Sequence, residues 1–347
     1  MQVLELNKSF LPARFTTKAP NKIILADLDD TLIPWVKFRK SWNEDFLREN
    51  QSAFKQVSER AVIGAVTGLD FMSVREIKGL LEGFPPFDFL STDNGKIVYF
   101  NENDVSSFGE WVSRVKPEDY DKGWETYIRE NTGWDRGLLF SVLEECFQNE
   151  CFAELESDGI KPELAYPHCK VYRREDVFNS FAVFSKGESA VYMIMNPEVN
   201  LHLRESEMKK FGEMIKEKYK GISDKEIKFN ISNHGNYFYM FFAPVGKVQI
   251  DKASIFDLIV SRLPKDKLRE LKAGIALGDS QNDKHLRVQK INLSLDETAP
   301  APVYAIHSGD LLKDDEEFSK HPFRSFTEGG NIGRALTNVV NKVDGDA

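Results

Sequence analysis

The sequence predicts an α/β protein with a doubly wound parallel sheet and a second, α+β unit inserted into it. In residues 21–100 and again in residues 243–347, apolar runs of strand length alternate with helical patterns. This alternation is typical of right-handed βαβ crossovers and of a parallel sheet. Residues 101–242 instead contain alternating and aromatic segments joined by turns, which indicates an antiparallel sheet with its own helices.

The first half of the sheet is predicted from three apolar runs with helical patterns between them. Residues 23–26 read as a buried strand, and apolar residues at helical spacing in residues 40–60 predict an amphipathic helix. A second strand has the sequence AVIGAV, residues 73–81 predict a helix, and a third strand has the sequence FDFL. Residues 1–20 show weak periodicity and form a lead-in without a predicted structure.

The inserted unit begins with a charged, aromatic and mostly helical stretch at residues 115–147. Five strand-like segments and a helix at residues 204–220 follow, the strands being KVYRRE, SFAVFS, AVYMIMN, EIKFNIS and YFYMFFAPV. After the insertion the α/β pattern returns with an apolar helix that opens at Asp251, the strand AGIALG, a strand at 303–307 and a helix at 331–342. The two outer segments therefore form one domain around the insertion.

Composition narrows the classes of partner. The chain has 347 residues, of which 41% are hydrophobic, and a net charge of -9 with acidic and basic residues well mixed. Nucleic acids and anionic membranes need a concentrated positive surface, so neither is expected as a partner. A small phosphorylated metabolite is compatible, because one metal ion and one lysine reverse the field locally. The oligomeric state is not predicted.

Cysteine usage and apolar runs favour a cytoplasmic protein. Three cysteines do not form a disulfide framework in a chain of this length. Cys146, Cys151, His168 and Cys169 could be arranged as a zinc set, but they lack a paired C-x-x-C, so scattered thiols are the favoured interpretation. No apolar run is long enough to span a bilayer, and the first twenty residues do not resemble a signal peptide.

A cluster of polar residues follows the first predicted strand directly: Asp27, Asp29, Asp30 and Thr31. Carboxylates resist burial unless they are paired or bind a metal. In an open α/β sheet, ligands bind at the carboxyl ends of the strands. The cluster therefore indicates either a cation site with reactive carboxylates or, as the alternative, a polar turn with capping side chains.

Other predicted strands also end in polar residues. Thr67 and Gly68 follow the second strand, Lys252 lies at a helix start, and GDSQND covers residues 278–283. The carboxyl ends of parallel strands share one edge of the sheet, so these residues, although far apart in sequence, are expected to converge.

Taken together, these motifs resemble those of the haloacid dehalogenase superfamily. Its four motifs stand here in the expected order as DLDDT, TG, DK and GDSQND. The insertion between DNG and DK looks like the type IIB cap of the Cof-type branch, an arrangement shared by sucrose-phosphate phosphatases and many bacterial sugar phosphatases. The resemblance implies a Mg²⁺-dependent phosphatase whose inserted unit sets specificity for a small phosphorylated metabolite, with a sugar phosphate favoured.

The same resemblance implies a role for each carboxylate. Asp27 is expected to act as the nucleophile and Asp29 as the general acid and base. The magnesium ligands are expected to be Asp27, the main-chain carbonyl of Asp29, and Asp279, with Asp283 in support. No role is assigned to Asp30.

The remaining motif residues are expected to bind the phosphoryl group or to position these carboxylates. Thr67 offers a hydroxyl, Gly68 a backbone N–H, and Lys252 an ammonium near the nucleophile. Asn282 is expected to orient the lysine or its loop, and Asn94 either binds substrate or only forms a turn with Gly95.

Three other functions are alternatives to a phosphatase. Dehalogenation is disfavoured, because that chemistry needs no leaving-group acid and Asp29 is present. A phosphomutase acting on hexose phosphates would use the same core. A non-catalytic phosphate-binding or regulatory protein would be marked by loss of Asp27, Asp29, Lys252 or Asp279, and none of these is lost.

Overall fold

The computed structural model describes most of the chain. The described residues are 20–34, 44–149, 153–154, 169–174, 180–185, 190–194, 200–234, 237–245, 250–280, 283–293, 299–309, 312–327 and 331–345. The expected lead-in at residues 1–19 and the candidate residue Asn282 lie outside them. The chain divides into two compact units, one formed by residues 1–125 and 250–347 and the other by residues 126–249.

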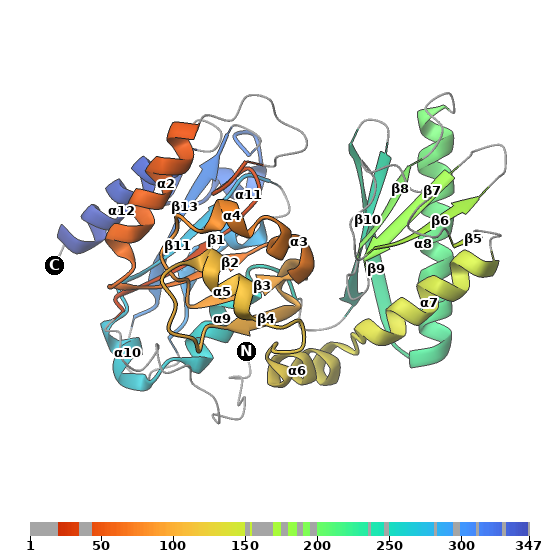
Figure 1. Cartoon of the computed structure of the whole chain (residues 1–347), viewed down its shortest axis with the longest axis horizontal. Helices are drawn as coiled ribbons and strands as arrows, with labels where there is room; N and C mark the ends of the chain where they lie inside the picture. Colours follow the sequence, from red (N-terminus) through yellow and green to blue (C-terminus); the bar gives the residue numbers. More distant parts are fainter. Residues whose placement is uncertain are drawn as a thin grey trace. The chain divides into compact units, whose positions relative to one another are not determined.

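A mainly parallel sheet forms the centre of the first unit (Figure 1). Among the described residues it has eight strands in the order β12-β13-β11-β1-β2-β3-β4, with β14 paired to β13. Only β4 and β12 run antiparallel to their neighbours. The strands are β1 (Lys22–Ala26), β2 (Ala61–Val66), β3 (Phe89–Thr92), β4 (Ile97–Phe100), β11 (Ala273–Gly278), β12 (Lys290–Ile291), β13 (Ala301–Ser308) and β14 (Arg324–Thr327).

The strand order confirms the doubly wound sheet. From β1 the chain proceeds outward through β2 and β3, whereas after the insertion it returns beside β1 as β11 and proceeds the other way to β13. The direction of winding therefore reverses between β1 and β11. Ligand sites of open α/β sheets form at such a switch point, outside the carboxyl ends of the strands.

Helices cover both faces of this sheet. On one face, α2 (Glu44–Val57) and α12 (Gly333–Gly345) lie side by side (Figure 1), and Phe54 of α2 is buried in one cluster with Ile275 of β11. On the other face, α9 (Ser254–Arg262) places Phe256 against Gly274, where an added Cβ would lie 3.1 Å from the ring. Successive strand residues face opposite ways, so Gly274 and Ile275 mark the two faces. The first unit also contains α3 (Phe71–Glu76), α4 (Lys78–Leu81), α5 (Phe108–Arg114), α10 (Lys265–Glu270) and α11 (Glu316–Ser319).

An antiparallel sheet forms the second unit, as the alternating segments predicted. Its described strands follow the order β5-β6-β7-β8-β10-β9. They are β5 (Ala153–Glu154), β6 (Cys169–Arg174), β7 (Ser180–Ser185), β8 (Ala190–Ile194), β9 (Glu226–His234) and β10 (Tyr237–Val245). The helix α8 (Leu201–Ser223) packs on β9 and β10, and α7 (Arg136–Asn149) packs on α8 (Figure 1).

The second unit starts later in the sequence than the insertion expected at residues 101–242. Residues 101–125 belong to the first unit, in which Phe108 and Trp111 of α5 are buried in the core and Phe108 stacks on Phe87. The helix α6 (Lys122–Thr132) spans the boundary. The apolar face of α5 completes the first core, although its sequence pattern alone does not say which core it joins.

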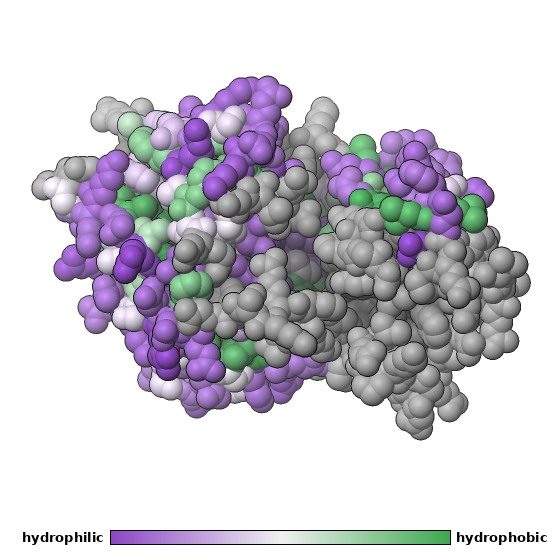
Figure 2. Space-filling view, turned by 90° about the horizontal axis from the view of Figure 1, so that it is seen from above, coloured by the Kyte–Doolittle hydropathy of each residue, from purple (hydrophilic) through white to green (hydrophobic). Residues whose placement is uncertain are grey.

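Most coloured residues on the face shown in Figure 2 are hydrophilic, and hydrophobic residues form small separate groups there. Among the described residues, no helix has both the length and the apolar character that a bilayer-spanning segment needs.

An ion pair with a buried lysine fastens the C-terminal helix to the first strand. The Lys22 side chain is only 1% exposed, and its Nζ lies 2.6 Å from Oδ1 of Asp344 on α12, whose side chain is 24% exposed. Asn21 also donates to Asp344 Oδ1, at 3.1 Å. Removing one partner of such a pair leaves a buried charge without compensation.

We therefore expect Asp344→Ala to lower the free energy of unfolding by roughly 3 kcal/mol, because the Lys22 ammonium would lose its counter-charge. Urea unfolding followed by circular dichroism measures this change. The matched control is Lys320→Ala, which removes an ion pair with Glu316 whose side chains are 67% and 86% exposed. The control should change stability by less than about 1 kcal/mol. Equal effects of the two substitutions would contradict the proposed contribution of the pair between Lys22 and Asp344.

Candidate active site

The register of the sheet brings the predicted carboxylates to one edge. Ala26 of β1 pairs with Leu277 of β11, so Asp27 and Gly278 both follow directly at the carboxyl end of their strands. The backbone N–H of Asp27 donates to the Leu277 carbonyl at 2.9 Å and thereby extends the ladder by one bond. Asp27 and Asp279 are thus neighbours at the switch point of the sheet, as predicted from the sequence.

Lys252 joins two of the carboxylates. Its Nζ lies 2.7 Å from Asp27 Oδ1 and 2.6 Å from Asp283 Oδ1. The three residues are 3%, 5% and 0% exposed, respectively. A buried ammonium between two carboxylates is stable because each charge has a partner at hydrogen-bond distance. The structure therefore brings together the first, third and fourth motifs.

The Asp283 carboxylate also organises the loop after β11. Its Oδ2 accepts hydrogen bonds from the backbone N–H groups of Asp279 and Ser280, both at 2.8 Å, and from the Ser280 hydroxyl at 3.2 Å. An added Cβ on Gly278 would lie 2.5 Å from the same oxygen, so only glycine leaves room for this carboxylate. Asp283 therefore fixes both Lys252 and the backbone that carries Asp279.

The charges around Lys252 set the pKa values of its partners. Burial raises the pKa of Asp27 to about 7, although the Lys252 ammonium acts in the opposite direction. Burial would raise the pKa of Asp283 too, but attraction to Lys252 prevails and lowers it to about 2. Burial alone would lower the pKa of Lys252, whereas the two carboxylates raise it above its usual value. Lys252 is therefore cationic and Asp283 anionic at neutral pH.

Two other carboxylates are held in an environment that disfavours their charged form. Burial and the nearby charge of Asp27 raise the pKa of Asp29 well above its usual range. Burial and the charge of Asp283 raise the pKa of Asp279 to about 9. Within the described part of the chain, Asp29 Oδ1 is buried and accepts no hydrogen bond. Among the described residues, this edge of the sheet thus carries more carboxyl groups than the Lys252 ammonium can neutralise.

A divalent cation fits this excess of negative charge. Asp27, Asp279 and Asp283 each offer a carboxylate oxygen, and these oxygens lie within 4.8 Å of one another. Mg²⁺ prefers hard oxygen ligands and keeps several of its waters, so a site with few protein ligands suits it. A cation here would also lower the raised pKa values of Asp27 and Asp279.

The second motif lies on the neighbouring strand end. Thr67 follows β2, is fully buried, and its hydroxyl oxygen accepts from the Leu69 N–H at 3.1 Å, which leaves its O–H able to donate. Asn94 donates its backbone N–H to the Thr67 carbonyl at 3.0 Å. Its side chain lies beside Gly68, where an added Cβ would be 3.3 Å from Asn94 Oδ1. Thr67, Gly68 and Asn94 therefore form one local cluster.

The Asn94–Gly95 turn has a further structural task. Gly95 has a φ of 94°, and an added Cβ would lie 2.4 Å from the Asp251 carbonyl oxygen. The turn can therefore lie directly against the backbone that precedes Lys252. Asp251 also bonds to the residues that follow Lys252. Its side chain accepts from the Ala253 N–H at 2.9 Å, and its own backbone N–H donates to Ser254 Oγ at 3.1 Å. These contacts fix the segment that carries the lysine.

Two residues near the site were missed by the sequence analysis. Ser308 ends β13 and donates its hydroxyl to the Asp30 carbonyl at 3.0 Å. Asn50 is fully buried on α2 and donates to the Leu32 carbonyl at 3.2 Å. Ser308 follows an apolar strand, so the rule that singled out Thr67 could have found it. Asn50 gives no such signal, because it is one polar residue within an amphipathic helix.

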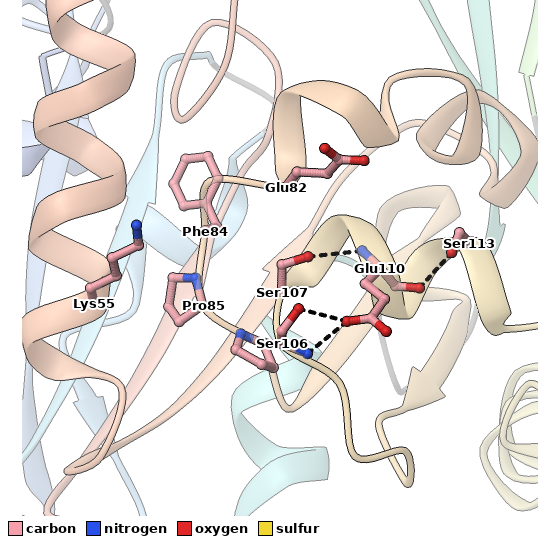
Figure 3. A pocket seen from close by; sticks show the side chains of 9 residues that line it. Lys55, Glu82, Phe84, Pro85, Ser106, Ser107, Glu110 and Ser113 are labelled. Atoms are coloured by element: carbon pink, nitrogen blue, oxygen red, sulfur yellow. Dashed lines mark hydrogen bonds between the residues drawn. The ribbon is translucent and has the colours of Figure 1, made fainter.

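The pocket shown in Figure 3 is separate from this cluster of carboxylates. Its volume is about 570 Å³, and residues such as Lys55, Phe84 and Glu110 line it (Figure 3). Two of the dashed bonds in Figure 3 cap the start of α5: Ser107 Oγ accepts from the Glu110 N–H at 3.0 Å, and Glu110 accepts from the Ser106 N–H at 2.8 Å. A further dashed bond lies within α5, where the Ser113 hydroxyl donates to the Glu110 carbonyl at 2.7 Å. The polar groups of this pocket therefore stabilise a helix start.

The comparisons with known proteins found similar solved structures. No protein-family model and no curated protein matches the chain. A haloacid dehalogenase-like hydrolase from Bacillus subtilis is 18% identical with a TM-score of 0.48, covering 94% of this chain and 93% of that chain. Trehalose-6-phosphate phosphatase from Aspergillus fumigatus is 13% identical with a TM-score of 0.48, covering 99% and 98%. An IMP-nucleotidase from Plasmodium falciparum is 11% identical with a TM-score of 0.35, covering 96% and 71%.

These three identities are 18% or lower and these TM-scores are below 0.5. The chemistry of this chain is therefore inferred from its own side chains at the carboxyl edge of the sheet.

We expect Mg²⁺ to raise the melting temperature of the chelator-treated protein by several degrees, because a ligand that binds only the folded state stabilises it. Asp279→Asn should remove most of this shift, whereas Asp257→Asn, which alters an exposed carboxylate on α9, should keep it. The shift should grow from about pH 6 to about pH 9, since the raised pKa values of Asp27 and Asp279 mean that fewer protons must then be displaced. An equal shift in wild type and Asp279→Asn would contradict the assignment of this site.

Proposed function

We propose that the protein is a Mg²⁺-dependent phosphomonoester hydrolase that acts through a phospho-Asp27 intermediate. The observation that carries the proposal is the Lys252 ammonium, which lies 2.7 Å from Asp27 and 2.6 Å from Asp283 beside Asp279. A nucleophilic carboxylate needs a nearby cation to orient it and to attract the phosphoryl group. The position of this group at the switch point of the sheet also fits a ligand site.

In the first step, an Asp27 carboxylate oxygen attacks the phosphorus atom and the ester P–O bond breaks. The leaving alkoxide takes a proton from Asp29, whose raised pKa favours the protonated form that a general acid needs. Two carboxyl groups two residues apart thus receive different tasks. Lys252 contacts Asp27, whereas burial raises the pKa of Asp29.

In the second step, water attacks the phosphorus atom of phospho-Asp27, and Asp29, now a carboxylate, accepts the proton of that water. The bond between phosphorus and the Asp27 oxygen breaks, which releases phosphate and restores both side chains. When bound, Mg²⁺ neutralises the developing charge on the phosphoryl oxygens, and Asp27, Asp279 and Asp283 would hold it together with the carbonyl of Asp29.

The second motif supplies neutral hydrogen-bond donors for the same group. The Thr67 hydroxyl and the Gly68 backbone N–H are proposed to donate to phosphoryl oxygens, and Asn94, whose side chain lies beside Gly68, is proposed to extend this set. Asn282 is proposed to support the loop that carries Asp279. The substrate is proposed to be a small phosphorylated metabolite, with a sugar phosphate favoured by the sequence resemblance. The inserted unit is proposed to set the specificity for this substrate, and the cytoplasm is the proposed location of the protein.

Phosphomutase activity on hexose phosphates is the alternative that uses the same groups. Incubation with a hexose bisphosphate separates the two, because a mutase yields isomerised monophosphate and little free phosphate. A regulatory protein that binds phosphate without hydrolysing it is the alternative from another class. Phosphate binding with no hydrolysis across a broad panel of phosphorylated metabolites would support that alternative.

Asp27→Asn should reduce the turnover of p-nitrophenyl phosphate by on the order of 10³-fold or more, since the amide is a poor nucleophile. Steady-state phosphate release with Mg²⁺ measures this loss, and circular dichroism checks that the variant is folded. Asp257→Asn is the matched control and should stay within about twofold of wild type. Unchanged turnover in Asp27→Asn would sink the proposed mechanism.

Asp29→Asn should discriminate between esters by the basicity of their leaving groups. Hydrolysis of phenyl phosphate, whose phenolate is a poor leaving group, should fall by about 10²- to 10⁴-fold, the usual contribution of a general acid. Hydrolysis of p-nitrophenyl phosphate should fall much less, because its leaving group needs little protonation. Equal losses for both esters would show that Asp29 does not act as the leaving-group acid.

A further inference from the structure

The turn after β1 is closed by its own backbone hydrogen bonds. The Leu28 carbonyl accepts from the N–H groups of Leu32 and Ile33 at 2.9 and 3.0 Å. The N–H of Asp30 in turn donates to the Ile33 carbonyl at 2.9 Å, and Asp29 forms a bridge with Ile33. Asp30 has a φ of 55°, a left-handed conformation that aspartate tolerates better than most residues. Asp29 is therefore part of a compact turn that is held together by its own backbone hydrogen bonds.

Two side chains from other elements hold this turn in place. Asn50 of α2 donates to the Leu32 carbonyl at 3.2 Å and accepts from the Gly333 N–H of α12 at 2.7 Å. Ser308 of β13 donates to the Asp30 carbonyl at 3.0 Å. The carbonyl that accepts the hydrogen bond from Ser308 belongs to Asp30, the residue next to Asp29. A shift of that carbonyl would therefore change the direction of the Asp29 side chain.

We infer that Ser308 is a positioning residue, which holds Asp29 at the angle needed to protonate the leaving group. The inference deepens the proposed function and rests on it. No role was expected for Asp30 from the sequence, and its contribution here is a backbone carbonyl and a left-handed turn. Ser308 is thus linked to the reacting atoms through the backbone of Asp30.

The register of the sheet explains why Ser308 can make this contact. His307 of β13 pairs with Gly278 of β11, so Ser308 lies one residue further, at the level of Asp279 and at the same carboxyl edge. Ser308 is 4% exposed, so its hydroxyl reaches the Asp30 carbonyl in a buried environment with little competition from water. The Ser308 hydroxyl thus contributes to fixing the direction of the Asp30 carbonyl, and Ser308→Ala would remove this contribution.

The expected consequence is a selective loss of acid catalysis. A displacement of a catalytic group by about 1 Å can lower the rate of the chemical step by roughly 10²-fold. Misplacement of Asp29 should affect esters whose leaving group needs a proton and should spare those whose leaving group does not. A general loss of stability or of metal binding would instead affect both kinds of ester equally.

The experiment compares the kcat of Ser308→Ala for phenyl phosphate and for p-nitrophenyl phosphate in the full-length protein with Mg²⁺. We expect a loss of about tenfold or more for phenyl phosphate and of less than about threefold for p-nitrophenyl phosphate. The matched control is Ser325→Ala, which removes a hydroxyl bonded at 3.5 Å to the Ala305 carbonyl on the same sheet. This control should show no preference between the two esters.

Equal losses for both esters, or no loss for either, in Ser308→Ala would overturn the inference. If Asp29→Asn discriminates between the esters and Ser308→Ala does not, the inference fails and the proposed function stands. If Asp29→Asn does not discriminate either, the proposed acid role fails and the inference falls with it. Should Ser308→Ala not fold, Ser308→Cys retains a similar volume with a weaker donor, and the same two outcomes apply to it.

Discussion

The site depends on one buried ammonium that stands between two carboxylates. Lys252 is only 3% exposed, and its charged form needs the carboxylates of Asp27 and Asp283 beside it. In the absence of the Lys252 ammonium, burial would in turn strongly disfavour the charged forms of these two carboxylates. The strands, turns and glycines around the site serve to deliver these groups to one point. Gly278 makes room for the Asp283 carboxylate, and Gly95 lets a turn approach the backbone before Lys252.

The same arrangement gives two neighbouring aspartates different chemistry. Asp27 lies at the strand end, where the lysine contacts it and where two further carboxylates lie close to it. Asp29 lies within a turn and has no ammonium within hydrogen-bond distance in the described structure, and burial and the charge of Asp27 raise its pKa well above the usual range. The proposed nucleophile and the proposed acid thus come from one short segment, because the direction of the backbone separates their environments.

Much of this was accessible from the sequence, because polar residues directly after apolar runs mark strand ends that share an edge. The alternation of strands and helices predicted the parallel sheet, and that rule then predicted the convergence of Asp27, Lys252, Asp279 and Asp283. The bond from Ser308 to the Asp30 carbonyl was not predicted, because a tertiary hydrogen bond to a backbone atom leaves no periodic pattern. The start of the second compact unit differs from the expected start of the insertion, since the pattern of α5 does not tell which core it joins.

The central claim is that Asp27 carries the phosphoryl group during turnover, and rapid-quench kinetics with p-nitrophenyl phosphate and Mg²⁺ test it most directly. Borohydride reduction of the quenched protein converts an acyl phosphate on aspartate into homoserine, which peptide mass spectrometry locates. The account predicts homoserine at position 27 in protein quenched during turnover and intact aspartate there in protein quenched without substrate. Turnover with aspartate intact at position 27, or with the phosphoryl group on another residue, would contradict it.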